Sequence, residues 1–269
     1  MGREKVHILH VISTVGNSAP VELQTAQRIT LESIEVARNC AQNLDITVAA
    51  SRFADEPLPA EWLNDFPCLR TSASDLWGVP GGPRLPLLRE ILEPIHSGID
   101  FDYVVFSNID IGLQSYFYQL VNLWARSGID AVNVTRRNVD SNLTSHGLAA
   151  IQASIGRRHP GSDCFIFAAE IAHKLTVGEV SVGLPQVTRT MALNLWLRSN
   201  RYRKLGSLHA TFHLGNEESW RSDAAKLKLR EHNAHALADV LDQLREEFGS
   251  DSVDLGFRSC LISDDGQHG

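Results

Sequence analysis

Residues 6–14, VHILHVIST, and residues 44–50, LDITVAA, decide the fold of this chain. Both segments are rich in β-branched residues, which is typical of buried strands. Between them, residues 25–41 carry apolar side chains on one helical face. A strand, a helix and a second strand in this order form the unit of a parallel sheet, where ligands bind at the carboxyl ends of the strands. We therefore expect a nucleotide near the loops after Ser13 and Ala50.

The rest of the sequence continues this alternation. We expect strands over residues 101–106, 130–135, 164–167 and 207–214, and helices over 85–95, 113–125, 191–197 and 223–247. The predicted fold class is α/β, with a Rossmann-type, mostly parallel central sheet flanked by helices and a long C-terminal helix. We expect one catalytic domain over residues 1–248, made of a nucleotide-binding half (1–110), an acceptor and metal half (111–221) and the C-terminal helix (222–248), followed by a polar tail (249–269).

Composition excludes several classes of protein. The formal charge of −7 over 269 residues disfavours a nucleic-acid binder, which needs a basic surface. Four scattered cysteines predict reduced thiols and no zinc site. The apolar run from Val6 to Ile12 is too short for a signal peptide or a membrane span, so we expect a cytoplasmic protein without a transmembrane segment.

The strongest local motif is VVFSNIDIGL at residues 104–113, a buried strand that ends in Asn108-Ile109-Asp110. Alternation along the chain lets the side chains of Asn108 and Asp110 face the same cleft. Oxygen ligands on a short turn suit Mg²⁺ or Mn²⁺, with Asp110 as a direct ligand and Asn108 as a weaker one or a ribose contact. The motif is equally compatible with a strand-to-helix turn that caps the following helix.

A second motif places His213 at the end of a late strand, followed by Gly215 and Trp220. A neutral imidazole is a competent third ligand for Mn²⁺. A single histidine at a strand end is more often a hydrogen-bonded structural residue, and Glu217 and Glu218 are also consistent with the acidic first turn of a helix.

These two motifs together resemble the glycosyltransferases of the GT-A fold. In that family a short acidic motif, often Asp-x-Asp, ends a central strand and binds a metal and the diphosphate of a nucleotide sugar. Asn108-Ile109-Asp110 is similar to it, with Asn in place of the first Asp. A late His followed by Gly and Trp occurs in retaining members, and the resemblance implies a metal role for His213.

Two further residue groups are candidates for contacts to the substrate. Asp163, after the His159-Pro160-Gly161 turn, is a possible general base or a carboxylate facing the anomeric carbon, and it is also compatible with a turn residue that caps its own backbone. Ser13 and Thr14 are candidate contacts to a base or ribose.

Arginines near the expected cleft are candidates for binding phosphate. Arg84 is expected at a helix N-terminus, and Arg136 and Arg137 follow a strand. Isolated arginines are, however, more often solvated surface residues.

The predicted function is transfer of a sugar from a nucleotide-diphosphate sugar, a UDP- or GDP-sugar, to an unknown acceptor. A sugar nucleotidyltransferase and a non-catalytic nucleotide- or sugar-binding module of the same fold are the alternatives. The sequence leaves the acceptor, the stereochemistry and the oligomeric state open.

Overall fold

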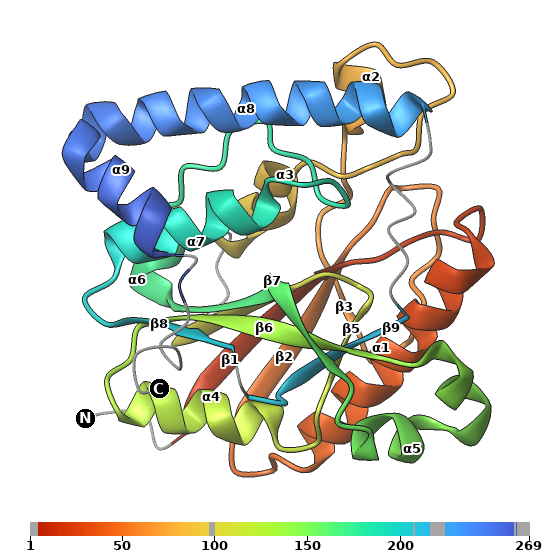
Figure 1. Ribbon diagram of the computed structural model, residues 1–269. Coiled ribbons are helices and arrows are strands. Elements are labelled where there is room, and N and C mark those ends of the chain that lie inside the picture. Colours follow the sequence, from red (N-terminus) through yellow and green to blue (C-terminus); the bar gives the residue numbers. More distant parts are fainter. Residues whose placement is uncertain (1–4, 97–99, 207, 216–223, 261, 263–269) are drawn as a thin grey trace.

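The computed structural model describes residues 5–96, 100–206, 208–215, 224–260 and 262 (Figure 1). Its strands are β1 (His7–Ser13), β2 (Asp45–Ser51), β3 (Asn64–Asp65), β4 (Tyr103–Ser107), β5 (Ile111–Leu113), β6 (Ala131–Val139), β7 (Arg157–Ala168), β8 (Tyr202–Leu205) and β9 (Thr211–Leu214). Its α-helices are α1 (Val21–Asn39), α2 (Ala73–Leu76), α3 (Leu88–Leu92), α4 (Phe117–Arg126), α5 (Leu148–Ala153), α6 (Ala169–Ala172), α7 (Val187–Arg198), α8 (Ala224–Phe248) and α9 (Ser250–Ser259), with 3-10 helices η1 (Glu93–His96) and η2 (Ser141–His146).

The described strands form one sheet, in the order β3-β2-β1-β4-β7-β6-β9-β5, with β8 paired to β6. The first four strands in this order are parallel to one another. β7 then enters antiparallel between β4 and β6, and β9 pairs parallel with β6 and antiparallel with β5. The predicted α/β class and mostly parallel sheet are confirmed.

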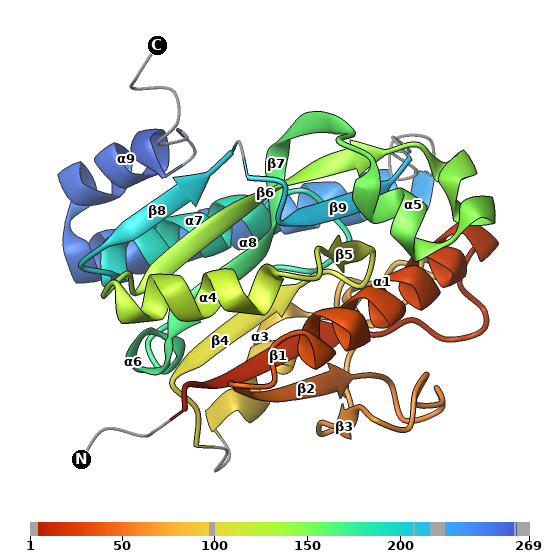
Figure 2. The same ribbon diagram turned by 90° about the horizontal axis from the view of Figure 1, so that it is seen from below.

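Helices cover both faces of the sheet. Figure 1 shows α7 and α8 above it, and Figure 2 shows α1 and α4 on the opposite face. Each face buries its own core, because strand side chains alternate between the two sides. Phe106 and Phe167 belong to the core under α7 and α8, whereas Val105 and Ile166 belong to the core under α1 and α4.

The C-terminal part of the described chain is helical. The predicted long helix is confirmed as α8, and its buried Val240 and Leu244 face the core. The expectation of a tail directly after α8 is wrong for residues 250–259, because α9 forms there and buries Val253. The segment is short and has a glycine, Gly256, inside it, which lowers its helix propensity, so the sequence indicated this helix only weakly. Within the described residues, no helix is long and apolar enough to cross a membrane.

A buried polar network ties β1, β4 and α4 together beneath the end of β4. His10 is 0% exposed, and its Nδ1 lies 2.7 Å from the Tyr118 hydroxyl while its Nε2 lies 2.8 Å from Ser107 Oγ. Hydroxyl groups can donate or accept, so both ring nitrogens are satisfied with the imidazole neutral. Burial lowers the pKa of His10 to about 3.

This network predicts acid sensitivity. Between the unfolded pKa of about 6.5 and the folded value of about 3, the unfolded chain binds more protons at His10, so stability falls as the pH falls. From pH 7 to pH 5 the loss attributable to His10 amounts to about 2 kcal/mol. His10→Gln, which cannot titrate, should show a correspondingly smaller loss in urea unfolding at the two pH values. His235→Gln, at an exposed position of α8, should follow the wild type, and parallel profiles for all three proteins would contradict the assignment.

Candidate functional site

The site lies where β4 ends. Asn108 follows β4, and the turn closes through a hydrogen bond of 3.1 Å from the Ile111 N–H to the Asn108 carbonyl. β5 then begins at Ile111, whereas the next helix, α4, begins only at Phe117. The expected strand-to-helix junction, and with it the helix-capping interpretation of Asn108 and Asp110, is therefore wrong. The turn joins two strands, and Ile109 is buried between the two partly exposed polar residues.

Asp110 and His213 meet because β5 and β9 pair. Ile111, next to Asp110, is opposite His213 in the antiparallel register. His213 Nε2 lies 3.3 Å from Asp110 Oδ2, and the two side chains are 12% and 26% exposed. Burial raises the pKa of the Asp110 carboxyl, but the His213 hydrogen bond and the charges of His213 and Arg136 outweigh burial, so the net shift of the pKa is downward.

The other polar atoms of His213 and Asp110 differ in their hydrogen bonding. His213 Nδ1 lies 3.2 Å from the Gly215 carbonyl, so Nδ1 carries a proton and donates it there. In the neutral ring, Nε2 then turns a lone pair towards the Asp110 carboxylate. The other carboxylate oxygen, Oδ1, is buried and has no hydrogen-bond partner among the described residues. Nε2 and the carboxylate thus face each other as two groups that can share a hydrogen atom or ligate one ion.

Asp163 lies on β7, beside the same turn. The Asn108 N–H donates to its carbonyl at 3.2 Å, and the Asn108 side-chain amide donates to its Oδ1 at 3.3 Å. Its Oδ2 accepts a hydrogen bond from Arg136. The interpretation of Asp163 as a turn residue capping its own backbone is wrong, because its carboxylate contacts Asn108, just after β4, and Arg136, within β6.

Irregular pairing brings Arg136 and Asp163 together. Val134 pairs with Cys164 but Thr135 pairs with Ser162, so Asp163 is an extra residue in β7. β6 also changes partner here, from β8 over residues 131–134 to β9 over residues 137–139. Bulges of this kind redirect side chains next to active sites. Arg136 was expected as a phosphate ligand; its guanidinium holds Asp163, and its Nε donates to Asn138 at 3.2 Å.

Ser13 and Thr14 lie at the carboxyl end of β1, as predicted. Ile12 pairs with Ser107, so Ser13 stands next to Asn108 across the sheet, and on its other side it pairs with Ser51 of β2. Ser13 and Thr14 are each only 6% exposed. Sequence reasoning missed Ser51, whose buried hydroxyl has no partner in the described part of the chain; nothing local distinguishes it from other strand-end serines.

Arg84 lies apart from this cluster. It precedes α3 by four residues, so the expected position at a helix N-terminus is wrong. Its guanidinium contacts Asp55 at 2.7 Å and stacks 4.1 Å from the ring centroid of Phe53. These partners belong to the loop after β2, one of the two loops where a nucleotide is expected, so Arg84 borders that loop rather than Asp110.

The donor set for a metal is incomplete among the described residues. No group of three His, Cys, Asp or Glu side chains within residues 5–96, 100–206, 208–215, 224–260 and 262 is placed to hold an ion. Asp110 and His213 supply two ligands, and Asn108 adds an amide. Glu217, Glu218 and Trp220 lie outside the described residues.

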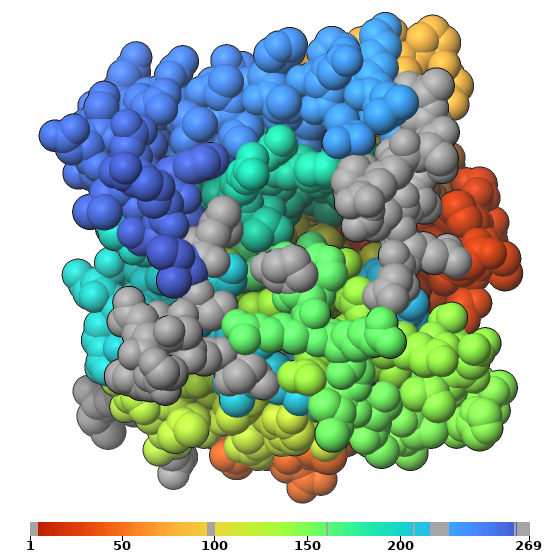
Figure 3. Space-filling view, in the orientation of Figure 1, coloured from red at the N-terminus to blue at the C-terminus, as the bar shows by residue number. Residues whose placement is uncertain are grey.

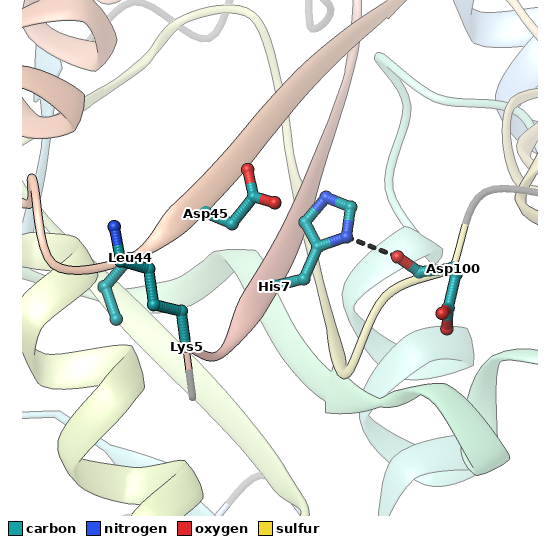
Figure 4. Close-up of a pocket in the computed structure, with 5 residues that line it drawn as sticks. All are labelled: Lys5, His7, Leu44, Asp45 and Asp100. Carbon is teal, nitrogen blue, oxygen red and sulfur yellow. Dashed lines mark hydrogen bonds between the residues drawn. The ribbon is translucent and has the colours of Figure 1, made fainter. Parts of the chain in front are cut away.

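A separate cavity lies on the opposite side of the sheet from this site, at the amino-terminal ends of β1, β2 and β4. It has a volume of about 460 Å³ and is lined by Lys5, His7, Leu44, Asp45 and Asp100 (Figure 4). His7 Nδ1 is hydrogen-bonded to the Asp100 carbonyl, and its Nε2 lies 2.9 Å from the Thr47 hydroxyl. Both ring nitrogens are thus engaged in holding strand ends, which indicates a structural role for this histidine.

Comparison with known proteins identifies the fold. No family model matches the sequence, and no curated protein matches it. Among solved structures, residues 1–349 of S. aureus TarS in complex with UDP-GlcNAc match with a TM-score of 0.57 and 10% identity, over 96% of this chain and 71% of that one. The same region of TarS in complex with UDP matches with a TM-score of 0.47 and 11% identity, over 90% and 72%. This chain is therefore similar to TarS in fold, and the GT-A-like α/β fold predicted from the sequence is confirmed.

The Arg136–Asp163 pair predicts a measurable coupling. Its side chains are 17% and 18% exposed, and removing either partner leaves the other charge poorly solvated. A double-mutant cycle of Arg136→Gln and Asp163→Asn in urea unfolding should give a coupling energy of about 1–3 kcal/mol. The same cycle on Arg70 and Glu93, which are 61% and 60% exposed, should give under about 0.5 kcal/mol. Equal couplings would show that the first pair is no more than a surface ion pair.

Proposed function

We propose that this protein transfers a glycosyl group from a nucleotide-diphosphate sugar, a UDP- or GDP-sugar, to an acceptor. One observation carries the proposal: three separate segments bring Asn108 and Asp110, Asp163, and His213 together at the carboxyl end of β4. In an α/β sheet this edge is where ligands bind. The similarity in fold to TarS, whose structure holds UDP-GlcNAc, supports a nucleotide sugar as the ligand class.

The residues present fit a divalent cation, Mn²⁺ or Mg²⁺. Asp110 offers its Oδ2, which faces His213, and His213 offers Nε2 with its proton held on Nδ1. The separation of 3.3 Å between Nε2 and Oδ2 is close to the distance between two neighbouring ligands of one ion, roughly 3 Å for bonds of about 2.1 Å. The bound ion would neutralise the negative charge that develops on the diphosphate leaving group.

Asp163 is the proposed carboxylate beside the reacting centre. Each of its oxygens has one protein donor, Asn108 or Arg136. A carboxylate accepts about four hydrogen bonds, so it retains capacity for a substrate hydroxyl. The two donors fix the orientation of the carboxylate, which a group acting on a substrate oxygen requires.

The presence of Asn at position 108 has a structural reason. Its amide nitrogen donates to Asp163 at 3.3 Å, where the carboxylate of an Asp would face another carboxylate. Asn108 is therefore matched to Asp163, and its replacement of the usual acid does not by itself indicate that catalysis has been lost. We accordingly favour the enzyme over the non-catalytic binding module.

Nucleotide binding tests this proposal directly. Thermal unfolding should be measured with UDP, GDP and UDP-GlcNAc, each with and without Mn²⁺. A ligand at 100 times its Kd adds about 2.7 kcal/mol, which corresponds to a rise in Tm of roughly 5–10 °C. Asp110→Asn should remove the Mn²⁺-dependent part of that rise and abolish donor turnover, whereas Asp242→Asn, on the exposed face of α8, should change neither.

Three outcomes would count against the proposal. No rise with any nucleotide would sink the assignment of the ligand class. A rise without hydrolysis or transfer under any metal would support the binding module. Release of pyrophosphate from an NTP and a sugar phosphate would instead identify a nucleotidyltransferase.

A further inference from the structure

His159 lies on the part of β7 that extends past the end of β4. Ser107, the last residue of β4, pairs with Cys164, so the residues of β7 before Cys164 overhang the carboxyl edge of the sheet. Figure 3 shows this green segment at the surface beside α7 in teal. His159 is half-buried, and the charges of Arg136, Asp163 and His213 all act on it. Its ring therefore lies close to the site described above.

The ring of His159 is held in one orientation. The Gly161 N–H donates to its Nδ1 at 3.0 Å. A Cβ atom at Gly161 would lie 2.9 Å from His159 Cε1, so only glycine lets the ring fold this closely against the backbone. Because Nδ1 accepts a hydrogen bond, the proton of the neutral ring is on Nε2. Burial, together with the charge of Arg136, lowers the pKa of His159, which favours this neutral form.

The Nε2–H group of His159 is thus a hydrogen-bond donor close to Asp163, the carboxylate proposed to lie beside the reacting centre. Nε2 has no hydrogen-bond partner among the described residues, although the ring is half-buried. A neutral donor suits a neutral oxygen, whereas a phosphate oxygen is better matched by a cation such as a guanidinium. The ring cannot act as a general base through Nε2, because that nitrogen already carries the proton.

We propose that His159 binds the substrate by donating its Nε2–H to a hydroxyl or carbonyl oxygen of the glycosyl group of the nucleotide sugar. This inference rests on the proposed function, and it assigns the overhanging part of β7 to sugar recognition. The nucleoside and diphosphate then contact the ends of β1, β2 and β4, on the other side of Asp163.

Two amide substitutions separate this role from a purely structural one. Asn has an oxygen that can replace Nδ1 as the acceptor for Gly161, but it is too short to place a donor at the position of Nε2. Gln places its amide nitrogen near the position of Nε2, but it has no acceptor at that of Nδ1. A sugar contact predicts that Gln retains binding and Asn loses it, whereas a structural anchor predicts the reverse.

The experiment is isothermal titration of each variant with UDP and with UDP-GlcNAc, in the presence of Mn²⁺. His159→Asn should bind UDP with a Kd within about twofold of the wild type and bind UDP-GlcNAc about three- to tenfold more weakly, which is the loss expected for one hydrogen bond. His159→Gln should recover most of that loss. His235→Asn, at an exposed position of α8, is the matched control and should bind both ligands as the wild type does.

Each other outcome overturns the inference. Equal losses for UDP and UDP-GlcNAc would place the contact on the nucleotide, and unchanged affinities would remove His159 from the site. If His159→Gln loses affinity for UDP-GlcNAc and His159→Asn retains it, the only role left to His159 is to anchor the Gly161 N–H. If the wild-type protein binds neither these ligands nor GDP and a GDP-sugar, the proposed function fails and this inference fails with it. That outcome differs from a wild type that binds UDP-GlcNAc and variants that bind it equally well.

Discussion

The bridge that Asp163 makes between Asn108 and Arg136 is the constraint on which the site depends. β7 pairs antiparallel with β4 and continues past its end, so Asp163 lies beside Asn108. The extra residue in β7 turns the Asp163 carboxylate towards Asn108, and the change of partner along β6 lets Arg136 reach it. A regular sheet with the same residues would point alternate side chains to opposite faces and leave the two charges unpaired.

The polar groups beneath and around this bridge differ in how well they are satisfied. Below the end of β4, both nitrogens of His10 have hydroxyl partners. At the edge itself, the buried side-chain oxygens of Ser51 and Asp110 have no partner in the described part of the chain, and neither do those of Thr135 and Ser162, which directly precede Arg136 and Asp163. An unsatisfied buried polar group costs about 1–3 kcal/mol. The buried side-chain oxygens of Asn133, Thr190, Ser199 and Thr211 likewise have no partner, so unsatisfied buried oxygens occur at this cluster and also elsewhere in the described residues.

Sequence reasoning predicted the local features and missed the non-local ones. β1, α1 and β2 were predictable because their apolar periodicity is contained in each segment, and Asn108, Asp110, Asp163 and His213 were selected because each stands at the end or start of an apolar strand. β5 was missed because three residues, Ile111–Leu113, carry no periodicity, and its pairing with β9 depends on a segment about a hundred residues away. The Arg136–Asp163 contact was equally invisible, since it follows from a bulge in the register. The catalytic and metal-binding roles of the selected residues stay predictions.

Charge is the remaining argument for a cation at the site. Asp110 and Asp163 each bring a negative charge, Arg136 brings the positive charge that compensates Asp163, and Arg84 is bound to Asp55 in the loop after β2. These carboxylates and guanidinium groups together have a net negative charge, which would repel a nucleoside diphosphate approaching alone. A divalent ion between His213 and Asp110, as proposed, would make the cluster positive. Under the proposed function, the Asp110 carboxylate would hold the counter-ion of the diphosphate, so an acidic residue at this position is compatible with an anionic ligand.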